Sequence, residues 1–210
     1  MPKTTTFLVG RFCHQVDDAL DLARAADGAV AFMSTRRMFV YEAAYLLAFS
    51  AWESFLEQAF LRFMCGYRNA HGTQSSTGTW VKASSLADAY TKLLVLSPRN
   101  PQYLLWHGPA LVINRSKLCF VNGAHEMVIV SAQTDIEDFA AVRHHVAHRS
   151  EDTEKKFQNS ALRLSGSTVL GGRAGRFLRA RTTDPVTGDD VSWLERICVD
   201  LQRYASQIAS

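Results

Sequence analysis

The feature that most constrains this chain is a helical spacing of apolar residues that recurs along much of its length. Over Cys13–Ala26, apolar side chains return every three or four residues, which is typical of a helix with one buried face. Over Met38–Met64 they lie on almost every side of the helix, which indicates a central buried helix. Gly28 and Gly66 follow these segments, and glycine commonly ends a helix. We therefore expect a helical bundle.

Three further segments extend this expectation to an all-α fold. Leu86–Leu96 predicts a short helix that Ser85 can cap at its N-terminus. Thr134, with a glutamate three residues later, predicts the start of a helix that runs to about His148. The last helix begins at about residue 190 or 192 and carries a single apolar stripe. We expect one domain over residues 1–210.

The remaining segments predict a loop-rich insertion and one small β-hairpin. Residues 68–82 are rich in glycine, serine and threonine and predict an exposed loop. Leu118–Val121 and Met127–Val130 flank Asn122-Gly123, a pair that favours a hairpin turn. Residues 165–181 predict a flexible, basic, glycine-rich loop. Its glycines have the spacing of a phosphate-binding P-loop, but the Lys-Ser/Thr that completes that motif is missing.

Composition limits the class of protein. Hydrophobic residues make up 47% and charged residues 20% of the chain, which is typical of a globular protein. The four cysteines are scattered, which disfavours a thiolate zinc site and fits a reducing cytoplasm. No apolar segment follows Lys3, so we do not expect secretion. Charged residues interrupt the most apolar stretch, Phe39–Phe63, so we expect a buried helix there and no membrane span.

Basic residues gather in one part of the chain. Residues 143–181 contain nine lysines and arginines against three acidic residues, whereas residues 1–142 are balanced. Such a segment attracts polyanions, chiefly through their phosphates. The alternative is a solvated basic loop with no partner.

The candidate chemistry lies at Arg143–His148, with the sequence Arg-His-His-Val-Ala-His. Cleaving RNA without a metal requires a base for the 2′-hydroxyl, an acid for the leaving oxygen and a cation for the phosphate. Histidine can act as base or acid near neutral pH, and arginine matches phosphate oxygens. Positions 143 and 148 lie about 140° apart around an ideal helix. A site formed by two copies across a two-fold axis would join them better, which favours a homodimer.

The segment resembles the R-x4-6-H motif of the HEPN superfamily (higher eukaryotes and prokaryotes nucleotide-binding domains). The helix over Phe49–Leu56 also resembles the aromatic and acidic helix that packs against the motif helix in that family. The resemblance implies a helical bundle that acts as a dimeric, metal-independent endoribonuclease without a cofactor. It also implies a toxin or antiviral-defence effector whose partners are RNA and an antitoxin or sensor protein.

The resemblance also implies roles for particular residues. Arg143 and His148 would form the catalytic pair. His144 stands where active members often carry asparagine and would support the phosphate. Glu53 would orient a motif residue, unless it is a buried acid with a structural partner. The residues that we expect to bind RNA are Arg149, Arg173, Arg176 and Arg179.

Three alternatives remain open on sequence alone. The histidines could cap backbone carbonyls at a helix end. His144 and His148, four residues apart, could share a zinc ion, although the glutamate of the H-E-x-x-H motif and a third ligand are missing. Finally, the chain could be a non-catalytic helical module that binds RNA or a partner protein.

Overall fold

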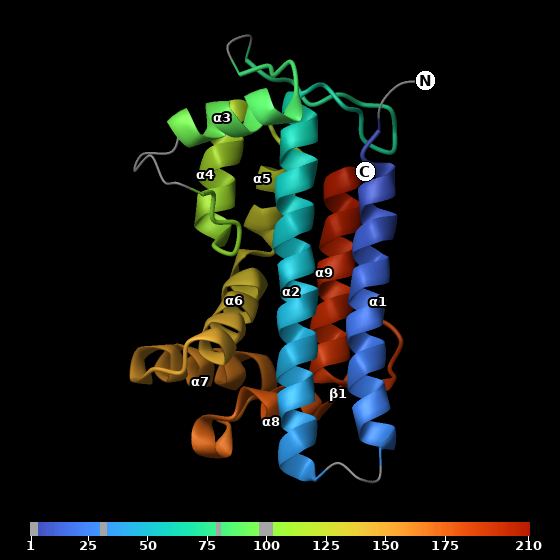
Figure 1. Ribbon diagram of the computed structural model, residues 1–210, viewed down its shortest axis with the longest axis vertical. Coiled ribbons are helices and arrows are strands. Elements are labelled where there is room, and N and C mark those ends of the chain that lie inside the picture. The colour runs from blue at the N-terminus through green and yellow to red at the C-terminus, as the bar shows by residue number, and fades with distance from the viewer. Residues whose placement is uncertain (1–3, 30–32, 79–80, 97–102) are drawn as a thin grey trace. The chain divides into compact units, whose positions relative to one another are not determined.

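The computed structural model describes residues 4–29, 33–78, 81–96 and 103–210. The helices and strands, in chain order, are α1 (Thr6–Gly28), α2 (Ser34–Met64), α3 (Leu86–Leu96), α4 (Pro109–Cys119), α5 (Ala124–Ser131), α6 (Gln133–Ala147), α7 (Glu151–Ser165), the 3-10 turn η1 (Leu170–Gly172), α8 (Ala174–Arg179), β1 (Arg181–Thr183), β2 (Asp190–Ser192) and α9 (Trp193–Ala209). Figure 1 shows the helices and the short hairpin. The predicted all-α bundle with one small β-hairpin is confirmed.

Most of the helices predicted from apolar spacing are present. α1 and α2 contain the two long segments, and α3 has the predicted bounds. α6 begins at Gln133, so Thr134 lies inside its first turn, and α6 ends at Ala147. α9 begins directly after Ser192, whose Oγ accepts the Glu195 N–H at 3.2 Å while Glu195 accepts the Ser192 N–H at 2.8 Å. This reciprocal capping box confirms the later of the two expected starts. The predicted loop over residues 68–82 forms no helix where it is described; positions 79 and 80 lie outside the described residues.

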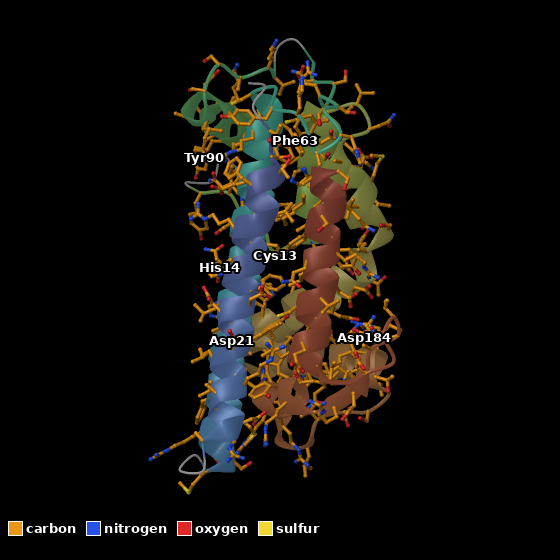
Figure 2. The ribbon with its side chains drawn as sticks, turned by 90° about the vertical axis from the view of Figure 1, so that its right-hand side faces the viewer. Cys13, His14, Asp21, Phe63, Tyr90 and Asp184 are labelled. Atoms are coloured by element: carbon orange, nitrogen blue, oxygen red, sulfur yellow. The ribbon has the colours of Figure 1, made fainter. Side chains whose placement is uncertain are left out.

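The predicted position of the hairpin is wrong. Residues 118–121 and 127–130 belong mainly to α4 and α5, and Asn122-Gly123 joins these two helices. A side chain at Gly123 would meet the Ser116 Oγ at 2.4 Å, so this position needs glycine because α4 approaches it closely. The observed hairpin pairs β1 with β2 in antiparallel register, with Thr182 opposite Val191. Asp184, labelled in Figure 2, holds its turn by accepting the Val186 N–H at 2.7 Å.

The predicted loop over residues 165–181 is largely ordered secondary structure. The turn η1, helix α8 and the start of β1 occupy most of it. α7, which was not predicted, precedes it. The Ser150 Oγ accepts the Thr153 N–H at 3.3 Å to cap α7, and Gly166 ends α7 in the left-handed conformation at φ +72°.

The chain divides into two compact units. The first comprises Met1–Phe12, Trp52–Ile136 and Gln202–Ser210, and the second comprises Cys13–Ala51 and Glu137–Leu201. Both units are therefore assembled from segments that lie far apart in the sequence.

The core of the first unit is aromatic. The Phe12 and Phe55 rings lie 5.5 Å apart, and Trp52 stacks on Phe55 at 6.0 Å. The fully buried His125 packs edge-on against Phe60 at 5.1 Å and hydrogen-bonds through Nε2 to the Leu56 carbonyl oxygen at 3.1 Å. This bond ties α5 to α2.

The core of the second unit surrounds the N-terminal half of α2. The fully buried Tyr45 donates its hydroxyl to the Phe139 carbonyl oxygen at 2.6 Å, which joins α2 to α6. Phe157 of α7 contacts Phe177 of α8 at 6.0 Å, and Phe177 stacks on Trp193 at 5.3 Å. On α1, the exposed His14 and Asp21, labelled in Figure 2, lie off the buried face. The contacts among Phe157, Phe177 and Trp193 anchor the basic segment, residues 143–181, in an aromatic core.

Candidate functional site

The candidate motif lies at the junction of α6 and α7 in the second unit. Arg143, His144 and His145 lie near the end of α6. The His148 N–H donates to the His144 carbonyl oxygen at 2.8 Å, so helical hydrogen bonding reaches the last motif residue. α7 begins after its cap, Ser150, so only a short link separates the two helices. His148 is exposed at this junction.

Arg143 lies in a different environment from His148. It is half-buried, and it lies close enough to Tyr45 of α2 for its charge to act on the phenol. Burial raises the pKa of Tyr45 well above its ordinary value, and the positive charge of Arg143 opposes this rise. Within one protomer, the two predicted catalytic side chains therefore differ in exposure. His144 is half-buried on α6 between them in sequence.

His145 is a structural residue. Its side chain is buried, and its ring stacks on Phe157 with centroids 4.8 Å apart and planes 3° apart. Its Nε2–H donates to the Gly172 carbonyl oxygen at 2.6 Å. His145 therefore hydrogen-bonds a backbone carbonyl, as one of the alternatives from the sequence expects. Its ring joins α6 to η1 and α7.

Glu42 of α2 organises the other side of this junction. It is buried, and it accepts two hydrogen bonds: one from the Arg149 guanidinium at 2.5 Å and one from the Gly175 N–H at 3.0 Å. The Arg149 guanidinium also lies over the Phe39 ring at 5.5 Å. Arg149, predicted to bind RNA, is therefore held by a buried carboxylate.

Gly175 permits a close approach of α8 to α2. A Cβ at this position would meet the Met38 carbonyl oxygen at 2.2 Å, and that backbone atom cannot rotate away. Gly175 thus allows the α8 backbone to lie against α2 and to reach Glu42. The close packing fixes the helix that carries Arg176 and Arg179.

Three of the predicted RNA-binding residues lie together in one pocket, here called the arginine pocket. It has a volume of about 720 Å³, and its walls come from the end of α1, the start of α2, η1, α8 and the start of β1. Its basic lining residues are Arg173, Arg176, Arg179 and Arg181. Asp27 is the acidic lining residue, and Met38 and Leu170 supply apolar surface.

A smaller hollow, of about 370 Å³, lies beside the motif end and has the opposite chemistry. Glu42, Glu151 and Glu154 line it together with Arg149 and Arg173. It shares Gly171 and Arg173 with the arginine pocket, so η1 and its flank separate the two. Arg149, the fourth predicted RNA-binding residue, lines this acidic hollow and not the arginine pocket.

Glu53, predicted to support the motif, belongs to the first unit. Its Oε1 lies 3.5 Å from the Nδ1 of His107. One turn further along α2, Glu57 accepts the Trp106 indole N–H at 2.7 Å. The role of Glu53 toward the motif residues stays a prediction.

Comparison with known proteins adds no assignment: no protein-family model, no curated protein and no solved structure matches the chain. Among the described helices, none is both long and apolar enough to cross a membrane. Over the described ranges, no group of three or more histidine, cysteine, aspartate and glutamate residues could hold a metal ion.

Sequence reasoning missed residues that shape the site. Glu42 is one of the charged residues that interrupt the apolar stretch Phe39–Phe63, and a buried acid in such a helix indicates a specific partner. Arg181, Asp27 and Tyr41 carry no local motif, because tertiary packing alone brings them to the arginine pocket. Gly175 gave one signal, since a glycine that begins a short apolar and basic run suggests a close backbone approach.

Proposed function

We propose that this chain is a metal-independent endoribonuclease of the HEPN kind, with Arg143 and His148 as its catalytic pair. The observation that carries the proposal is the position of the Arg-x4-His motif at the α6–α7 junction, in the same compact unit as the arginine pocket. A phosphate-binding surface and a proton-transferring histidine are the two requirements of RNA cleavage without a metal.

The exposure of each motif residue supports a separate role. His148 is exposed and can exchange protons with a 2′-hydroxyl or a leaving 5′-oxygen. Arg143 is half-buried, and an arginine held in a less polar environment stabilises phosphate charge more strongly than one in open water. His144 is half-buried on the same helix end and would add a polar contact to the phosphate.

The difference in environment within one protomer supports a homodimeric site. The α6–α7 junction of a second copy, related by a two-fold axis, would supply the His148 that faces the first copy's Arg143. The acidic hollow beside the junction disfavours RNA approach along Glu154, so the substrate would reach the motif from the dimer side.

The first experiment measures RNA cleavage by purified protein in excess EDTA. Arg143→Ala and His148→Ala are compared with His14→Ala, which removes an exposed histidine that pairs only at the surface with Asp18. We expect cleavage by the wild type and by His14→Ala, and a loss of at least about 100-fold in the two motif variants. Replacing the 2′-hydroxyl at the cleaved position with hydrogen should stop cleavage, because that hydroxyl is the nucleophile.

A complementation experiment tests the shared site. If each site takes Arg143 from one protomer and His148 from the other, mixing the two inactive variants restores one intact site in each heterodimer. Random exchange then returns about a quarter of the wild-type activity. A mixture that stays inactive while exchange is demonstrated would place both residues in one protomer.

One observation favours a second candidate function, a non-catalytic module that binds RNA. The arginine pocket could bind nucleic acid without any histidine, and His145 is structural. Wild-type protein that binds RNA but leaves varied RNAs intact, or motif variants that cleave as well as the wild type, would favour this module over the nuclease.

A further inference from the structure

The arginine pocket and the acidic hollow differ in what they can bind. The arginine pocket is lined by four arginines and one aspartate, whereas the acidic hollow is lined by three glutamates and two arginines. An extended polyanion that crossed both would meet repulsion chiefly at Glu154, because Glu151 is paired with Lys155 at 2.7 Å. Of these two hollows, only the arginine pocket therefore has an excess of positive charge, which suits a compact anionic group better than a long backbone.

The four arginines divide into two pairs. Arg179 donates from Nε to Asp27 at 2.9 Å, and Arg181 donates from Nε to Asp190 at 3.0 Å. Arg173 and Arg176 are exposed, and neither forms an ion pair with any residue that the structure describes. Two guanidinium groups thus keep their donors available at one pocket.

Hydrogen bonds to two buried side chains hold the segment that carries these two arginines. Arg173 follows η1, whose Gly172 carbonyl oxygen accepts the His145 Nε2–H. Arg176 lies on α8, whose Gly175 N–H donates to the buried Glu42. A site on a fixed frame loses less freedom when it binds a ligand.

The size and charge of the pocket indicate its ligand. A volume of about 720 Å³ is typical of small-molecule sites. A terminal phosphate monoester carries a charge of about −2 and three acceptor oxygens, whereas an internal phosphodiester carries a single charge. Two unpaired guanidinium forks match the terminal group. Met38 and Leu170 offer apolar contact to the group that follows the phosphate.

We propose that the arginine pocket binds a terminal phosphate group, carried by the end of a nucleic-acid strand or by a free nucleotide. Arg173 and Arg176 donate hydrogen bonds to the phosphate oxygens, while their ion pairs with Asp27 and Asp190 hold Arg179 and Arg181 in the pocket wall. The inference deepens the proposed function, because it changes three predicted RNA-binding residues from general backbone contacts into an anchor for a phosphate terminus. The inference rests on the proposed function only where the phosphate belongs to the end of a nucleic-acid strand.

Isothermal titration calorimetry of the full chain at about 0.15 M salt tests the proposal, because diffuse charge effects are screened beyond about 8 Å there. The probes are inorganic pyrophosphate, adenosine 5′-monophosphate, and DNA octamers with a 5′-phosphate, a 3′-phosphate or hydroxyl ends. DNA lacks the 2′-hydroxyl, so binding is measured without cleavage and a failure of the nuclease proposal leaves this test intact.

The variants are Arg173→Gln and Arg176→Gln, with Arg36→Gln as the matched control. Arg36 is exposed on the first turn of α2 but does not line the pocket. We expect each pocket variant to weaken pyrophosphate binding about tenfold, the loss of one charge-assisted contact, and Arg36→Gln to change it less than about twofold. Circular dichroism should show unchanged folding.

The outcomes separate the two sources and define failure. A phosphorylated octamer that binds at least about tenfold tighter than both the hydroxyl octamer and adenosine 5′-monophosphate identifies a strand end. Equal binding of adenosine 5′-monophosphate and the phosphorylated octamer identifies a free nucleotide. The proposal is overturned if pyrophosphate does not bind and phosphorylated and hydroxyl octamers bind alike, or if Arg36→Gln weakens binding as much as Arg173→Gln.

Discussion

The Nε2–H of His145 donates to the carbonyl oxygen of Gly172 at 2.6 Å. This bond joins the end of the motif helix to η1, the turn that separates the arginine pocket from the acidic hollow. Neighbouring histidines of one motif thus have different physical roles. His145 joins α6 to η1 as a buried residue, whereas His148 is exposed to solvent.

Exchanging each of these histidines for alanine should therefore change the free energy of unfolding by different amounts. His145→Ala removes a buried ring and leaves the Gly172 carbonyl without this donor, and we expect it to lower the free energy of unfolding by about 2–4 kcal/mol. His148→Ala should change it by less than about 0.5 kcal/mol, because the residue is exposed. Urea denaturation followed by circular dichroism measures both.

His145→Gln provides the control, because its side-chain amide can still donate to the Gly172 carbonyl and should recover part of the lost stability. Equal destabilisation by His145→Ala and His148→Ala would contradict the structural role of His145.

Two substitutions of Glu42 separate the contribution of its ion pair with Arg149 from that of its hydrogen bond with the Gly175 N–H. Glu42→Gln keeps an acceptor oxygen for the Gly175 N–H but removes the charge that pairs with Arg149, whose side chain is 57% exposed. We expect it to cost about 1 kcal/mol or less, because the Arg149 side of the pair is exposed and solvent screens its charge. Glu42→Ala also leaves the buried Gly175 N–H without an acceptor, and we expect it to lower the free energy of unfolding by about 1–3 kcal/mol more. Thermal unfolding of both variants gives the difference, and equal losses would show that the bond to Gly175 adds nothing.

Gly175→Ala should destabilise the protein because its Cβ cannot fit beside the Met38 carbonyl oxygen. We expect a loss of about 1–3 kcal/mol and weaker pyrophosphate binding, since α8 must move away from α2. Gly10→Ala is the matched control. Gly10 lies inside α1, and a Cβ there meets nothing within 4 Å. It should stabilise the chain by about 0.5–1 kcal/mol, because alanine is the better helix former. A neutral Gly175→Ala would show that α8 packs less tightly than described.

Stability should fall as the pH is lowered from about 6.5 to about 4, partly because of His125. Burial lowers the pKa of His125 to about 4 in the folded protein, against an ordinary value of 6.5. Between these values the unfolded chain binds a proton that the folded chain does not, so acid favours unfolding, by up to about 1.4 kcal/mol per pH unit. The loss is complete below about pH 4, where both states are protonated.

His125→Phe should flatten this dependence, because phenylalanine keeps the contact with Phe60 and does not titrate. His14→Ala, which alters an exposed histidine, should keep the wild-type slope. Urea denaturation at half-unit pH steps gives the slopes, and identical slopes for wild type and His125→Phe would contradict the prediction.

The sequence predicts the long helices well because each buried helix face requires apolar residues at a regular helical spacing. The apolar spacing of α1, α2 and α9 corresponds to the faces that are buried. The predicted hairpin fails because an apolar run of four residues has no period that distinguishes a strand from a helix. A better signal was present: Pro109 follows Gly108 at the first position of α4, where proline favours a helix start.

The site could be predicted only in part. The clustering of Arg173, Arg176 and Arg179 was visible as local charge, and they do line one pocket. The difference between His145 and His148 was not visible, because the two residues are of one type and only the contact with Phe157 distinguishes them. Arg181 and Asp27 are brought together by tertiary packing, which no spacing along the chain records.

The hydrogen bond from the Ala70 N–H to the Ala209 carbonyl oxygen, at 2.7 Å, has a consequence for biosynthesis. It cannot form before residues near 209 have left the ribosome, and neither unit is complete without part of α9. Nascent α1 and α2 must therefore wait, with their apolar faces uncovered, until translation has passed the last helix. We expect both units to complete their folding only after α9 has been synthesised, and to depend on chaperones that shield the exposed helices during that interval.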